Sequence, residues 1–149
     1  MEANTVGIEA TREFLNRARV LQREIERKER RIQTLRDMAT STTAAMSDMP
    51  RSDSPNLQRM ETVLCKAADL EAEINNDMER LDMIKAETTE AISGLEDYRE
   101  QQVLYGRYVG SKAWIDIAAE CSCARVTVMR YHQSGVAHLA EKWAGKVDT

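Results

Sequence analysis

Apolar side chains recur at alternating intervals of four and three residues through the first third of the chain. This heptad spacing is typical of a helix that packs along its length against another helix. The residues between these positions are good helix formers of both charges, so propensity and pattern together predict a helix of about 35 to 40 residues. Lys28 interrupts the series without breaking it. The positions are Phe14, Ala18, Leu21, Ile25, Lys28, Ile32, Leu35, Ala39, Thr42 and Met46.

Both prolines of the chain lie in the segment SDMPRSDSPN, residues 47–56. Its prolines, serines and aspartates cannot continue a helix, so this segment is predicted to be a loop. Within it, Ser54 and Pro55 fit the N-cap and the first-turn proline of a second helix. The second helix carries a wider stripe of apolar or small residues, which consists of Met60, Val63, Leu64, Ala67, Leu70, Ile74, Met78, Leu81, Ile84, Thr88, Ile92 and Leu95.

Two long helices joined by such a loop are most simply arranged as an antiparallel helical hairpin, a coiled coil within one chain. A hairpin of this kind has a thin core, because each helix buries only one side. The wide stripe of the second helix therefore favours the pairing of two hairpins into a four-helix bundle, and hence a homodimer or higher oligomer. Alternatively, the extra width packs against a C-terminal domain.

Glycine and aromatic residues divide the chain sharply. Only one glycine precedes Gly94, whereas the rest of the chain holds the other five glycines and six of the seven aromatic residues. We therefore expect an all-α fold in two parts, a hairpin in residues 1–97 and a small helical domain in residues 98–149. The formal charge of −4 combines −8 in residues 47–97 with +2 in each flanking segment. Because the net negative charge comes from one segment, the total charge of the chain does not exclude a nucleic-acid partner.

Residues 104–133 carry the offsets of a helix-turn-helix unit. Such a unit needs a small residue where its helices cross, apolar residues at fixed distances from it, and a tight turn four residues later. Ala118 fits the small crossing residue, and Ser122 fits the turn, where Gly is commonest. Gly110 and Ser111 fit the helix stop and the cap that introduce the unit. The matching apolar positions are Trp114, Ile117, Cys121, Cys123, Val128 and Tyr131.

If Val128 and Tyr131 point inward, helical geometry turns the opposite face of the second helix outward. In a major groove, Arg suits guanine, Gln suits adenine, and Val or Met suits the thymine methyl group. Thr127 and Lys112 are better placed for phosphate than for bases. His132 lies next to the outward face and is expected to be a polar or phosphate-contacting residue. The alternative is a solvated face of a small helical domain. The outward residues are Arg125, Val126, Met129, Arg130 and Gln133.

The C-terminal domain resembles region 4 of sigma factors, and the similar domains of phage late-gene activators of the ArpU and RinA type, over LYGRYVGSKAWIDIAAECSCARVTVMRYHQSGVAHLAEKW. The matched elements are Arg107 with Tyr108, residues 114–118, and residues 128–139. The hairpin also resembles that of Gram-positive phage and prophage proteins ending in this domain, over MSDMPRSDSPNLQRME and DLEAEIN. The resemblance implies a phage-encoded DNA-binding regulator of transcription, with double-stranded DNA as its partner and host RNA polymerase as a further one.

Two positions depart from the pattern of that family. Gly106 stands in the first helix of the domain, where a large apolar residue is usual, and Ala124 stands where Ser or Thr usually caps the recognition helix. Each change costs about 1 kcal/mol of helix stability, although Ser122 is an alternative cap. No segment resembles the promoter-melting part of a sigma factor, so we expect a helper that recruits or redirects polymerase.

Other classes of function fit the sequence less well. The chain has no glycine-rich phosphate loop and no nucleophile elbow, so we expect no enzyme, no catalytic residue and no cofactor. Two cysteines and two histidines follow the pattern C-x-C-x8-H-x5-H. Cys121 and Cys123 occupy apolar offsets, however, so no metal site is expected. The remaining alternatives are an assembly protein such as a small terminase subunit, and a sigma-like adaptor that binds polymerase or a host factor without DNA.

The sequence also bears on the compartment of the protein. No apolar stretch approaches the roughly 20 residues that span a membrane, and the N-terminus lacks the pattern of a secretory signal. The three cysteines, an odd number, fit a reducing compartment better than a disulfide framework. We therefore expect a protein of the bacterial host cytoplasm without a membrane partner.

Overall fold

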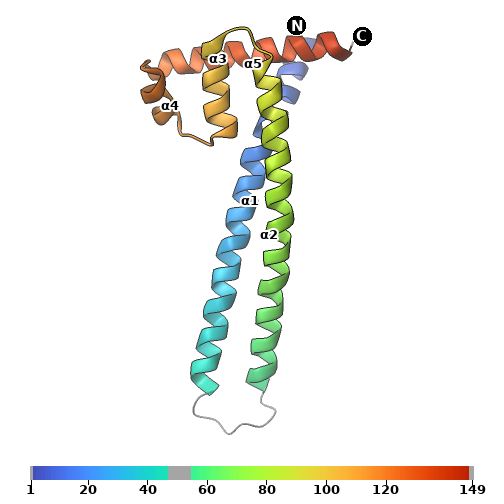
Figure 1. Ribbon diagram of the computed structural model, residues 1–149, viewed down its shortest axis with the longest axis vertical. Helices are drawn as coiled ribbons and strands as arrows, with labels where there is room; N and C mark the ends of the chain where they lie inside the picture. The colour runs from blue at the N-terminus through green and yellow to red at the C-terminus, as the bar shows by residue number, and fades with distance from the viewer. Residues whose placement is uncertain (1, 47–54, 148–149) are drawn as a thin grey trace. The chain divides into compact units, whose positions relative to one another are not determined.

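The computed structural model describes residues 2–46 and 55–147, and every regular element in those ranges is helical. This confirms the all-α class. In chain order the elements are α1 (Glu2–Met46), α2 (Pro55–Ser93), α3 (Tyr98–Leu104), the π-helical turn η1 (Tyr105–Val109), α4 (Trp114–Cys121) and α5 (Arg125–Val147) (Figure 1). None of these helices combines the length and the apolar character that a membrane span requires.

The boundaries of the first two helices differ from those expected. α1 begins at Glu2, well before the first heptad position, so it is longer than predicted. The predicted loop, residues 47–56, is too long at its end, because Pro55 and Asn56 already belong to α2. A proline suits the first turn of a helix, where its missing N–H has no intrahelical partner. The rest of that loop and the predicted Ser54 cap lie outside the described residues.

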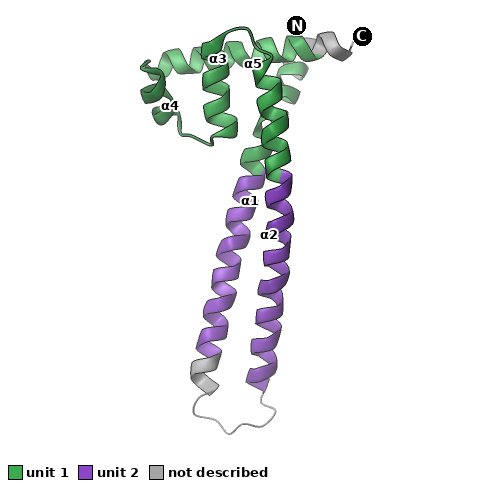
Figure 2. Cartoon of the chain, viewed as in Figure 1, with its two compact units in different colours: residues 1–20, 81–149 green, residues 21–80 purple. Residues whose placement is uncertain are grey.

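The chain forms two compact units (Figure 2). Unit 1 consists of residues 1–20 and 81–149, and unit 2 consists of residues 21–80. This grouping differs from the expected division between residues 97 and 98. The physical reason is that Leu15 and Ile92 are buried in the same hydrophobic cluster as Val136. The C-terminal elements therefore share one core with the first twenty residues of the chain and with the end of α2.

Unit 2 contains residues 21–46 of α1 and 55–80 of α2, two segments that lie side by side and run in opposite directions. Lys28 pairs with Asp77, and Arg36, further along α1, pairs with Glu71, which comes earlier in α2. The apolar α1 positions predicted for the seam between Leu21 and Ala39 are buried here, as the heptad pattern requires. Thr42 is half-buried, and the side chain of Met46 lies outside the described residues. The buried apolar residues of this unit are Leu21, Ile25, Ile32, Leu35, Ala39, Val63, Ala67 and Ile74.

The stripe predicted for α2 is wrong at two positions in this unit. Met78 is 51% exposed and Leu64 is also exposed, whereas the neighbouring Asp77 is only 7% exposed. Asp77 faces the seam because its carboxylate accepts a hydrogen bond from the Lys28 ammonium, with 2.6 Å between Oδ2 and Nζ. Lys28, the polar interruption of the α1 pattern, is thus paired with Asp77 of α2. Because Asp77 faces the seam, the next residue, Met78, points outward.

The core of unit 1 depends on two glycines that allow close approach of helices. A Cβ atom at Gly135 of α5 would lie 3.1 Å from Leu104 Cδ1, and one at Gly106 would lie 3.3 Å from Ile117 Cγ1. The absence of a side chain at Gly106, which appeared from sequence to be a cost, therefore allows α4 to pack against η1. The main cluster around them comprises Leu15, Ile92, Leu95, Leu104, Tyr108, Val109, Val136 and Leu139.

Candidate nucleic-acid interface

A tight turn separates α4 from α5. Ser122 adopts a left-handed conformation, with φ 53° and ψ 41°, directly after the last residue of α4. The N–H of Cys123 donates to the carbonyl of Ala118 across this turn, at 3.1 Å. This hydrogen bond satisfies a carbonyl that the end of the helix would leave without a partner. Ser122 thus closes α4, and the chain enters α5 three residues later at Arg125.

The inward faces of α3, α4 and α5 meet in one small hydrophobic cluster. Val103, Ile117 and Val128 are its buried members. Trp114, Ala118, Cys121, Cys123 and Tyr131 pack around them. Burial raises the pKa of the Cys121 thiol, and the neighbouring Cys123 and Glu120 raise it further. Across residues 2–46 and 55–147, no three His, Cys, Asp or Glu side chains are grouped so as to hold a metal ion.

Away from this cluster, α5 presents the residues that the sequence assigned to base contacts. Val126 is 70% exposed. Arg125, Arg130 and Gln133 are also exposed, whereas Met129 and Thr127 are half-buried. Val126, Arg130 and Gln133 follow at intervals of four and three residues, so they share one side of the helix. The α5 face therefore combines cationic, amide and apolar groups that point away from the core.

Lys112, which the sequence assigned to phosphate, already has an anionic partner. Its Nζ lies 2.7 Å from Oε1 and 2.8 Å from Oε2 of Glu120. Both side chains are partly exposed. Lys112 is thus paired with a residue of α4, and Glu120 compensates its charge locally.

The rings of Tyr108, Trp114 and His132 and the guanidinium of Arg107 pack together on the buried side of α5. The Arg107 guanidinium lies 4.4 Å from the centre of the Trp114 ring, and the edge of Trp114 meets His132 with 4.9 Å between ring centres. His132 also shares a hydrogen bond of 2.5 Å with the Tyr108 hydroxyl. Because His132 is only 7% exposed, the expectation that it contacts phosphate is wrong. Burial, together with the positive charges of Arg12 and Arg107, lowers the pKa of His132 to about 4.

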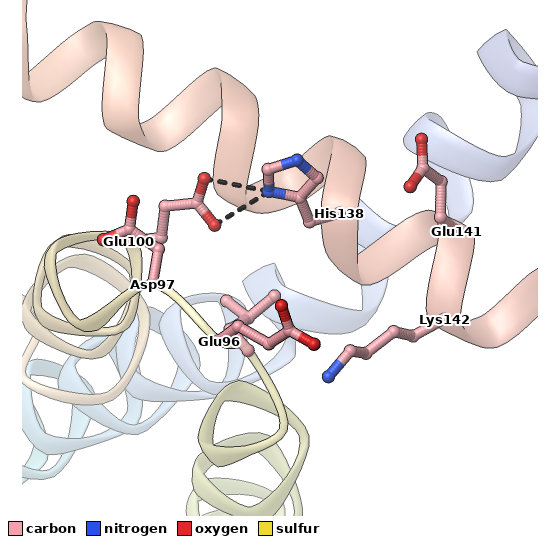
Figure 3. Close-up of a pocket in the computed structure, with 7 residues that line it drawn as sticks. Glu96, Asp97, Glu100, His138, Glu141 and Lys142 are labelled. Carbon is pink, nitrogen blue, oxygen red and sulfur yellow. Dashed lines mark hydrogen bonds and ion pairs between the residues drawn. The ribbon is translucent and has the colours of Figure 1, made fainter.

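A hollow of unit 1 is lined mainly by acidic side chains, so its charge is opposite to that of the arginines of α5 (Figure 3). His138 faces Glu100 there, with its Nδ1 2.9 Å from each carboxylate oxygen, and Glu100 is only 3% exposed. The hydrogen bond to Glu100 and the charge of Glu100 raise the pKa of His138. Ser134 donates a further hydrogen bond to the same carboxylate at 2.8 Å. This hollow of about 390 Å³ is unsuited to phosphate, because it is lined by Leu95, Glu96, Asp97, Glu100, His138, Glu141 and Lys142.

Sequence reasoning missed the arginines of α1 and the buried Glu100. Arg12 and Arg19 carry no motif, and only the folded chain links them to η1, where their charges act on Tyr108 and Arg19 donates to the carbonyl of Arg107. Glu100 and His138 lie too far apart in sequence for their spacing to signal a pair. Comparisons with protein family models, with curated proteins and with solved structures find no match to this chain.

Proposed function

We propose that the chain is a sequence-specific DNA-binding regulator of transcription, of phage or prophage origin, in which α4, the Ser122 turn and α5 act as a helix-turn-helix. The observation that carries the proposal is the exposed α5 face. Val126 lies there among Arg125, Arg130 and Gln133. An exposed apolar side chain beside arginines, which donate hydrogen bonds, and a glutamine, which both donates and accepts them, suits a major groove with its thymine methyl groups and purine edges.

The test is selection of bound duplexes from a random library by the full chain, followed by affinity measurements on the enriched sequence and on scrambled DNA. Arg130→Ala is expected to weaken binding to the enriched sequence by about 1–3 kcal/mol and to relax preference at one base pair. Arg31→Ala, which removes one exposed arginine from α1, is the matched control. If Arg130→Ala weakened binding to every sequence equally, the assignment of α5 as the recognition helix would be wrong.

The place of the selected sequence in the phage genome then separates regulation from packaging. A match upstream of a promoter favours the regulator. A match at a packaging site favours the assembly protein.

A second candidate function, an adaptor that binds RNA polymerase, is supported by exposed apolar groups elsewhere in unit 1. Ile115 of α4 is 72% exposed, and Tyr98 is exposed to a similar extent. Exposed apolar groups of this kind are common at protein interfaces. Co-sedimentation with purified bacterial RNA polymerase, compared between the wild type and Ile115→Asp, tests this role. Binding that Ile115→Asp abolishes in the absence of DNA would favour the adaptor.

We further propose that α1 and α2 form an antiparallel hairpin that pairs with a second copy. Leu57, Leu64 and Met78 are exposed in unit 2 and are separated by multiples of seven residues, so they lie along one side of α2. Sedimentation of the full chain is expected to show a dimer that Leu64→Lys with Met78→Lys dissociates. A wild-type monomer at tens of micromolar would contradict this part of the proposal.

A further inference from the structure

We propose that Arg12 and Arg19 of α1, together with Arg107 of η1, form a phosphate-binding cluster that holds the DNA backbone next to the groove read by α5. We call these three residues the arginine cluster. The inference rests on the proposed DNA-binding function and extends it to α1, which the sequence assigned to oligomerisation alone. It also replaces Lys112 as the main source of phosphate contacts.

The first support is the way that α1 meets the C-terminal elements in unit 1. Arg12 and Arg19 are two helical turns apart, so they lie on the same side of α1. Leu15, between them in sequence, is fully buried in the cluster that includes Tyr108 and Val136. This packing fixes the register of α1 against η1 and α5. Nη1 of Arg19 then donates a hydrogen bond of 3.3 Å to the carbonyl of Arg107, which lies 88 residues further along the chain.

The second support is that Arg107 of η1 contacts the residues at the start of α4. Its Nη1 donates to the carbonyl of Lys112 at 3.1 Å, and its guanidinium stacks on Trp114, the first residue of α4. Trp114 in turn contacts His132 of α5. Arg107 therefore lies beside α4 and is linked through Trp114 to α5.

The third support is electrostatic. Arg12 is exposed and Arg19 is half-buried. Neither forms an ion pair with any carboxylate among the residues that the structure describes. By contrast, Arg17 pairs with Glu87 at 3.1 Å, and Lys112 pairs with Glu120. The positive charges of Arg12, Arg19 and Arg107 all act on Tyr108, where each opposes the rise in pKa that burial causes.

The guanidinium groups of Arg12 and Arg19, which pair with no carboxylate among the residues that the structure describes, fit the phosphate backbone of a duplex. Arginine binds phosphate oxygens through two parallel hydrogen bonds, and such contacts position a protein on DNA without reading its sequence. Each phosphate neutralised releases counterions, which makes the affinity fall steeply with salt. The arginine cluster therefore has a signature that differs from that of Arg130, because its loss affects all sequences alike.

The experiment measures the dissociation constant of the full chain for fluorescent duplexes, one with the selected sequence and one scrambled, over a series of NaCl concentrations. Arg12→Gln with Arg19→Gln is compared with Arg23→Gln with Arg31→Gln, which removes the same charge from exposed positions of α1 in unit 2. Lys112→Gln is measured in parallel. Circular dichroism melting curves establish that each variant folds like the wild type.

The arginine-cluster variant is expected to lower the slope of log affinity against log salt by about 2 and to weaken both duplexes about equally, by tenfold or more at low salt. The control pair and Lys112→Gln are expected to leave the slope within experimental error of the wild type. An unchanged slope in the arginine-cluster variant overturns the inference and leaves the α5 proposal standing. A loss confined to the selected sequence also overturns it, since phosphate contacts carry no sequence information. Wild-type protein that binds neither duplex overturns the proposed function and the inference together.

Discussion

The ammonium group of Lys28 lies 2.6 Å from Oδ2 of Asp77, in the seam between α1 and α2. Both side chains are largely enclosed, and Glu73 lies 3.6 Å from the same ammonium. A polar pair in an otherwise apolar seam fixes which residues face each other, because any shift in register would leave a buried charge without its partner.

This pair predicts an asymmetric response to mutation. Lys28→Leu is expected to lower the melting temperature by several degrees, and by more than Asp77→Leu does. The reason is that Asp77 retains only Arg80, at 3.9 Å, whereas Lys28 retains Glu73 and Glu24. The double variant Lys28→Leu with Asp77→Leu is expected to melt at or above the wild-type temperature. Thermal unfolding by circular dichroism measures all three, and a double variant less stable than both single variants would contradict this account.

The left-handed residue that ends α4 predicts a stabilising substitution. Ser122 has a φ of 53°, which strains an L-amino acid with a side chain but not glycine. Ser122→Gly is therefore expected to raise the free energy of unfolding by about 1 kcal/mol, and Ser122→Val to lower it. Chemical denaturation measures both. Equal stability of the two variants would show that the turn relaxes on mutation.

His132 predicts a loss of stability in mild acid. Its pKa in the folded protein is about 4, against 6.5 for a free histidine, so the unfolded chain binds the proton first as the pH falls. The contribution of His132 to stability is complete above pH 6.5 and is lost progressively towards pH 4. It amounts to about 3 kcal/mol. Denaturation across this range should show a shallower pH dependence for His132→Phe than for the wild type.

The other histidine provides a control of opposite sign. The pKa of His138 is raised by Glu100, so its contribution is present in acid and is lost as the pH rises above its folded pKa. His138→Gln should therefore make the acid destabilisation of the protein steeper. A His138→Gln variant with the same pH profile as His132→Phe would mean that the two environments have been assigned wrongly.

Leu15 predicts that the first helix stabilises the C-terminal elements. Its side chain is fully buried in the unit 1 cluster, so Leu15→Ala is expected to cost about 2–5 kcal/mol. Both tryptophans of the chain, Trp114 and Trp143, belong to unit 1. Their fluorescence therefore reports the unfolding of this unit. Val20→Ala, at an exposed position of the same helix, is expected to change stability little.

The heptad spacing was enough to predict the helical class and the buried side of α1, because periodicity records which side of a helix avoids water. It did not predict that α2 would turn Asp77 inward and Met78 outward. That choice depends on the charge of Lys28 in the opposite helix, and a pattern of apolar residues contains no information about such a pair. Similarly, Gly106 is unfavourable in an isolated helix, and only the approach of Ile117 explains it.

The exposure of Arg125, Val126, Arg130 and Gln133 was predictable, because all four lie on one helix. The exposed positions of α5 follow from placing Val128 inside, which local periodicity allows. The arginine cluster depends on contacts between residues far apart in the chain, such as Arg19 with Arg107, which no local pattern encodes. The same limit applies to Lys112, because its partner Glu120 becomes visible only once α4 is folded.

The composition of unit 1 from residues 1–20 and 81–149 has a consequence for biosynthesis. Leu15 emerges from the ribosome long before Val136 and Leu139, the residues that bury it. Contacts this distant in sequence close slowly, since a long loop must be ordered before they form. During that interval Leu15 lacks its packing partners from α5. The proposed DNA-binding surface is therefore completed only when the last helix has been translated.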